Sequence, residues 1–177
     1  MKLADFYNYE NEKFSPVRDA ARRVTAAMQN ANRGLDSLKE WVLIEMGLVH
    51  TSDAIHELAH KQPLRFDQIG DILHQRHLMQ EYPATEEYTK RPDDMDGVFE
   101  AAIELLQANE DALKEFVRVC DASGLYALAR QAESIQIENS TDYDKLLKAW
   151  QMFDTTDASA TSYDNWILHL FHEGGED

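Results

Sequence analysis

One helical segment and the linker that follows it decide the fold: residues 51–92 read TSDAIHELAHKQPLRFDQIGDILHQRHLMQEYPATEEYTKRP. Apolar residues recur there at three- and four-residue spacing down to about residue 80, which predicts an amphipathic helix with a kink at Pro63. Residues 81–92 contain Pro83 and Pro92 and are expected to form a linker with one short helical turn around 85–88. A linker of this length can carry the chain back along a helical bundle, which a tight turn cannot do.

Helical periodicity continues on both sides of this segment. The apolar spacing and the cap residues predict long helices at 16–47, 93–121 and 125–153, and a short amphipathic helix at 162–172 after a polar run at 154–161. With the helix at 51–80, the chain has four long helices and one long connection, between the second and the third. We therefore expect an all-α fold: a ferritin-like four-helix bundle over residues 16–153 with a long crossover, an N-terminal tail at 1–15, and a C-terminal tail at 154–177 that carries the short extra helix.

The chain is strongly acidic: it has 33 Asp and Glu residues against 17 Lys and Arg residues, and a formal net charge of −16. Such a surface repels phosphate backbones, and residues 1–14 and 173–177 are acidic as well, so DNA binding is expected to be weak or absent. The single cysteine, Cys120, excludes an internal disulfide, and the sequence has neither an apolar run long enough to span a bilayer nor a signal-peptide pattern. These features predict a cytoplasmic protein without a membrane partner.

A polar stripe lies on the helix at 51–80, opposite its apolar face. On a helical projection, His56, His60 and Asp71 fall within about 60° of one another, whereas the apolar positions from Ile55 to Leu73 fall on the other side. Two interpretations stay open: a solvated face, or a metal site completed by ligands from a second chain. The second is chemically reasonable because imidazole and carboxylate groups suit first-row metals such as iron.

Residues of this helix and linker resemble a known family. The pattern consists of Ile55-His56-Glu57, an aspartate, Asp71, fifteen residues after His56, and the linker segment YPATEEY at 82–88. It is similar to the second helix and the following linker of the Dps-like miniferritins, a branch of the ferritin superfamily. The resemblance implies a homo-oligomer built on a two-fold dimer, with a hollow dodecamer as the full assembly. It also implies that ferrous iron is oxidised between two-fold-related subunits and stored as ferric mineral.

Carried over residue by residue, the resemblance implies three metal ligands on this helix. They are His56, Asp71, and His60 at a position where the family has an acidic ligand. The position of the family's bridging glutamate holds Gln75, and a neutral amide is a poor bridge between two cations. A coupled pair of iron ions is therefore not expected.

The first helix also departs from the family, because its two histidine positions hold Lys39 and Val42. Glu45, three residues after Val42, is the candidate to replace the lost ligand, and His50 is a second candidate. We expect one weakly held metal ion, with iron as the candidate. Its site would be shared between two antiparallel copies of the chain, and iron oxidation would be slow.

Two other functions remain open on the sequence. The chain could be a non-catalytic ferritin-like oligomer that serves as a scaffold or a stress-related binding protein. His56-Glu57-Leu58-Ala59-His60 also matches the H-E-x-x-H motif of zinc metalloproteases, but such a site needs a third ligand and a substrate cleft, and Pro63 interrupts the pattern three residues later. Measurements of metal content and of ferrous oxidation would separate these functions from iron handling.

Overall fold

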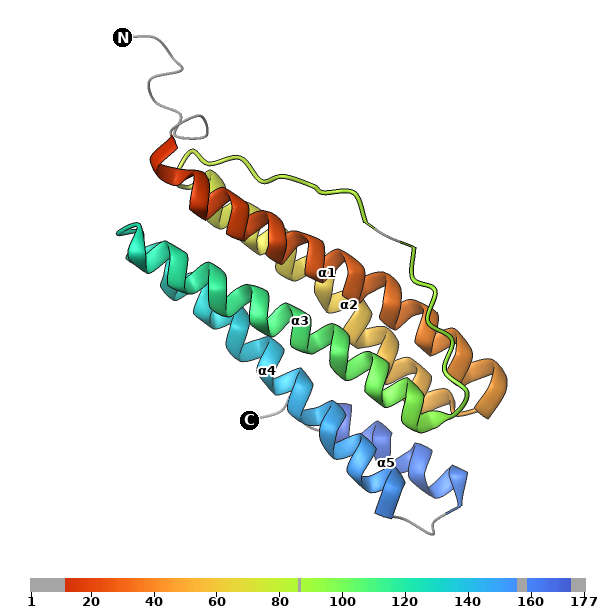
Figure 1. The fold of residues 1–177 in the computed structure, drawn as a ribbon. Coiled ribbons are helices and arrows are strands. Elements are labelled where there is room, and N and C mark those ends of the chain that lie inside the picture. The colour runs from red at the N-terminus through yellow and green to blue at the C-terminus, as the bar shows by residue number, and fades with distance from the viewer. Residues whose placement is uncertain (1–11, 86, 156–158, 173–177) are drawn as a thin grey trace.

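The computed structural model describes residues 12–85, 87–155 and 159–172 (Figure 1). A short 3-10 turn, η2 (Glu12–Phe14), precedes α1 (Ser15–Trp41), which continues into a π-helical turn, η3 (Val42–Met46). The remaining elements are α2 (Val49–His74), α3 (Met95–Ala122), α4 (Tyr126–Thr155) and α5 (Ala160–His172). The described residues contain helices and irregular segments but no strand, which confirms the all-α prediction.

The helices form two hairpins that lie side by side, α1 with α2 and α3 with α4 (Figure 1). Between them the chain runs back along α1, where Glu81 pairs with Arg22 at 3.8 Å and Tyr88 lies against Gly34. The predicted long connection is therefore present, and α2 and α3 run in the same direction. The predicted helical turn at 85–88 is wrong at 85, 87 and 88, which are irregular, and residue 86 lies outside the described residues. The ferritin-like assignment stays a prediction.

A layer of buried polar side chains divides the core halfway along the bundle. One apolar cluster packs α5 against the end with the α1–α2 turn, and a second fills the opposite end. Between them, Asn109 Nδ2 donates to Gln62 Oε1 at 2.8 Å, and Asn139 Nδ2 donates to Glu110 Oε2 at 3.2 Å. Because buried polar groups must find partners, this layer fixes the register of α2, α3 and α4.

The first predicted helix, 16–47, is α-helical only as far as Trp41. The next five residues form the wider π-helical turn, and Gly47 ends it with a φ of 66°, a left-handed conformation that glycine adopts without a Cβ clash. The second helix then begins at Val49, two residues earlier than predicted. The turn between α1 and α2 is thus short, which holds the two helices together along their length.

The second predicted helix, 51–80, ends at His74. The backbone N–H of Leu78 donates to the carbonyl of Leu73 at 3.0 Å, and His77 has a φ of 58°. This is a left-handed cap of the kind that usually uses glycine. Since no glycine marks the position, the predicted end at Gln80 was too late.

Candidate metal centre

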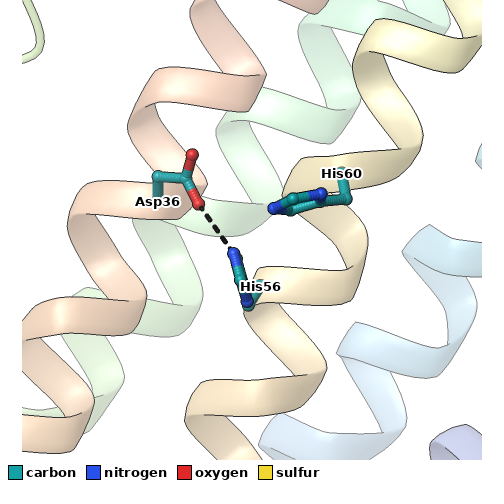
Figure 2. A group of neighbouring side chains, drawn as sticks. All are labelled: Asp36, His56 and His60. Carbon is teal, nitrogen blue, oxygen red and sulfur yellow. Dashed lines mark ion pairs between the residues drawn. The ribbon is translucent and has the colours of Figure 1, made fainter.

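Asp36 of α1 lies beside His56 and His60 of α2 (Figure 2). His56 Nε2 is 3.7 Å from Asp36 Oδ1, and the two imidazole rings meet edge to face with centroids 4.2 Å apart. One candidate ligand atom from each side chain can be chosen so that all three lie within 4.8 Å of one another. Two neighbouring helices of a single chain therefore bring a carboxylate and two imidazoles together.

Pro63 lies inside α2, three residues after His60, and changes the hydrogen bonding of the helix there. Proline has no backbone N–H, so Pro63 cannot donate the usual helical hydrogen bond to the carbonyl of Ala59. Asn32 of α1 donates to that carbonyl instead, with its Nδ2 at 3.0 Å. Asn32 lies one turn before Asp36, and Ala59 precedes His60 directly. The contact thus sets the register of the two helices at the cluster.

Asp36 Oδ1 is a buried oxygen with no hydrogen-bond donor in contact. An ionised carboxylate oxygen in this position loses hydration without gaining a hydrogen bond, which costs free energy unless a cation or a proton compensates. The nearest charged partner is the His56 ring at 3.7 Å, which is charged only when it is protonated. The unpartnered oxygen is the feature that best fits a bound cation.

The donor set suits a first-row divalent ion. Zinc and ferrous iron both bind imidazole nitrogen and carboxylate oxygen, at about 2.0 to 2.2 Å, so ligand atoms around one ion lie about 3 to 3.5 Å apart. The distance from Asp36 to His56 is close to that range, and rotation of the exposed His60 side chain would close the remaining gap. Three protein ligands leave further coordination positions for water or a second ligand.

The other predicted ligands lie elsewhere. Asp71 and Gln75 line a depression between α2 and α4, and Asp71 is about 22 Å along the helix from His56. Glu45 is exposed in the π-helical turn and does not belong to the cluster. His50 contributes its backbone N–H to Asp164 of α5 at 3.0 Å. Within one chain, then, only His56 and His60 of the predicted set come together, and sharing of the site with Asp71 of a second copy remains a prediction.

Sequence reasoning missed Asp36. The polar stripe of α2 was expected to gain further ligands only from a second subunit, whereas α1 of the same chain places a carboxylate beside it. A signal was present in the hairpin register: Asp36 lies eleven residues before Gly47, and His56 and His60 lie nine and thirteen residues after it. In two antiparallel helices joined by a short turn, residues at about equal distances before and after the turn lie at the same level.

The metalloprotease motif is present in sequence, but its glutamate does not belong to the cluster. Glu57 pairs with Lys61 at 3.0 Å and is not among the grouped ligands. A zinc protease uses this glutamate to activate a metal-bound water. The contact with Lys61 therefore disfavours that chemistry at this site.

Comparison with known proteins finds no matching family model and no matching curated protein. Across residues 12–85, 87–155 and 159–172, none of the helices combines the length and the apolar character that crossing a membrane requires.

Proposed function

We propose that this protein is a metal-handling member of the ferritin-like class that takes up ferrous iron, or a similar divalent ion, at Asp36, His56 and His60. The observation that carries this proposal is the buried Asp36 Oδ1, which faces two imidazoles and has no hydrogen-bond donor. The net charge of −16 adds long-range attraction for cations. The long crossover between α2 and α3 supports the ferritin-like assignment.

Each side chain has a distinct part in this proposal. Asp36 neutralises part of the charge of the ion, and the imidazoles of His56 and His60 donate nitrogen lone pairs. Asn32 keeps α1 and α2 in register around them. Ferrous iron is the cargo and would bring one-electron redox chemistry. Because Gln75 replaces a bridging carboxylate and lies on the α4 side of α2, we expect a single ion per chain and slow oxidation.

We also propose that the protein forms a homo-oligomer, which is a two-fold dimer at least, with a dodecamer as the favoured full assembly. Four large apolar residues are exposed within seven positions around the α1–α2 turn, namely Leu43, Ile44, Met46 and Val49. Ile44 is the most exposed of them, at 71%. A concentrated apolar patch on a charged surface is typical of protein contact sites. Sedimentation of a stable monomer at micromolar concentration would contradict this part of the proposal.

The test of the metal proposal is a titration of metal-free protein with Co(II), followed by its visible absorption, and with Fe(II) under anaerobic conditions. We expect one ion per chain, and we expect His60→Gln to weaken binding at least about tenfold. His74→Gln is the matched control, because His74 is an exposed histidine of the same helix outside the cluster. Equal affinity in both variants would reject the site. An oligomer that binds neither ion would favour the non-catalytic scaffold.

A further inference from the structure

A second site candidate lies on the opposite side of α2, where α2 and α4 leave an open depression of about 380 Å³ between them. Arg65 is part of its wall, although Arg65 itself is only 3% exposed. The side-chain cluster of Asp36, His56 and His60 lies between α1 and α2, so this depression is separate from it. Its chemistry differs too, since cationic side chains line it in a strongly acidic chain.

The guanidinium of Arg65 is incompletely paired. Its Nη2 donates to Asp142 at 2.5 Å, but its Nε and Nη1 are buried without a hydrogen-bond acceptor. The nearest further carboxylate is that of Glu138, whose Oε2 lies 3.9 Å from Nε, beyond hydrogen-bond distance. The Glu138 side chain is 57% exposed. A buried arginine with free donors, covered by one exposed carboxylate, is therefore suited to accept an anion from outside.

Charge favours a singly charged anion here. Lys61, Arg65 and Lys145 bring three positive charges to the depression, and Glu138 and Asp142 bring two negative charges. Burial opposes the charged form of Lys61, but Asp142 at 3.0 Å and a hydrogen bond to Glu57 outweigh it and raise the pKa of Lys61, so it is cationic at neutral pH. The five charges sum to +1, which one monoanion neutralises, whereas a dianion such as phosphate would leave the depression with a net negative charge.

The mouth of the depression is apolar. Leu64 and Ile137 both line it and are exposed by 64% and 67%, which places them among the most exposed large hydrophobic residues of the described chain. An apolar group resting between them would remove this surface from water. The apolar rim of Leu64 and Ile137 and the guanidinium of Arg65 thus favour a ligand with both an apolar part and an anionic end.

We propose that the α2–α4 depression binds a small organic monocarboxylate with an apolar group. Its carboxylate accepts a hydrogen bond from the free Nε–H of Arg65 after the exposed Glu138 side chain swings away, and its apolar group lies between Leu64 and Ile137. The ligand carboxylate takes the position beside Nε that the Glu138 carboxylate approaches at 3.9 Å, and a hydrogen bond between two charged groups there is stronger than one between neutral groups.

The test uses calorimetric titration of the full chain with hexanoate, with hexanol and inorganic phosphate as comparison ligands. Wild type should bind hexanoate more tightly than either comparison ligand. Glu138→Gln should tighten hexanoate binding by about three- to tenfold, because it removes the competing carboxylate. Glu133→Gln is the matched control. Glu133 lies on α4 outside the depression, and its replacement by glutamine removes the same charge. Leu64→Gln should weaken binding through the apolar rim.

The proposal is overturned if neither wild type nor Glu138→Gln binds hexanoate in the millimolar range. Equal effects of Glu138→Gln and Glu133→Gln on hexanoate affinity would mean that only the overall charge of the protein matters. That result would overturn the proposal as well. Phosphate binding as tight as that of hexanoate would reject the ligand class. Arg65→Lys, which keeps the charge but loses the planar donors, should abolish tight binding. If that variant does not fold, the Glu138 and Leu64 variants decide the question.

Discussion

Asn32 links α1 to α2 where Pro63 interrupts the hydrogen bonding of α2, and Asn32→Ala is expected to break that link. In wild type the freed carbonyl of Ala59 accepts a hydrogen bond from Asn32 Nδ2 of α1 at 3.0 Å. Leaving a buried acceptor without a partner costs about 1 to 3 kcal/mol. Because the contact is partly buried, we expect Asn32→Ala to lower the free energy of unfolding by about 1 to 2 kcal/mol.

A second substitution isolates this effect. Pro63→Ala restores a backbone N–H that can donate to the carbonyl of Ala59, and a proline inside a helix costs up to about 3 kcal/mol, so this variant should be more stable than wild type. In the Pro63→Ala background, Asn32→Ala should cost about 0.5 kcal/mol or less, because the carbonyl keeps a donor. The coupling energy between the two positions is then about 1 kcal/mol, above the scatter of about 0.5 kcal/mol seen for independent sites.

The assay is urea unfolding of the four proteins, followed by far-ultraviolet circular dichroism. Arg33→Ala, an exposed change on the same helix, should leave stability nearly unchanged. Since Asn32 lies one turn before Asp36, Asn32→Ala should also weaken Co(II) binding without changing its stoichiometry. Equal costs of Asn32→Ala in both backgrounds would refute the role assigned to Pro63 and Asn32.

Three further outcomes follow from single contacts. Asp164 of α5 accepts from the backbone N–H groups of His50 and Thr51 and from Thr51 Oγ1, so it caps α2 from a distance, and Asp164→Ala should cost about 1 to 2 kcal/mol in a melting experiment. Burial opposes ionisation of Glu110, but hydrogen bonds donated by three side chains of α4 outweigh it and lower its pKa below 4.5. The unfolded chain then takes up this proton first, so stability should fall as the pH drops through 4.5 and below, and Glu110→Gln should flatten that part of the profile. Burial raises the pKa of the Cys120 thiol to about 12, so a thiol reagent at pH about 8 should label it only as fast as the protein unfolds; rapid labelling of native protein would contradict this burial.

The helix ends show where sequence reasoning succeeds and where it stops. The predicted end of the helix at 93–121 agrees with α3, because Gly124 adopts a φ of 74° and Leu125 N–H donates to the carbonyl of Cys120 at 2.9 Å. The end of α2 has the same hydrogen-bond arrangement, but His77 occupies the left-handed position. A glycine in the sequence indicates such a cap, whereas a histidine does not.

Only part of the candidate site could be predicted from the sequence. The helical period alone places His56 and His60 on one face, and the structure agrees. Asp36 depends on the register of α1 against α2, which is set by a π-helical turn at Val42–Met46 and by the contact of Asn32 with Ala59. Neither follows from local periodicity, because both arise from packing between helices. Asp71 shares the polar stripe but lies too far along α2 to join the cluster in one chain.

The most direct test of the proposed site is the metal stoichiometry of Asp36→Asn compared with that of Asp71→Asn. Both variants remove one carboxylate charge while keeping the size of the side chain, and one lies in the cluster while the other does not. We predict that Asp36→Asn loses the single Co(II) or Fe(II) ion per chain and that Asp71→Asn keeps it. Retention of the ion by Asp36→Asn together with its loss in Asp71→Asn would contradict a site built within one chain and would place the metal between two copies.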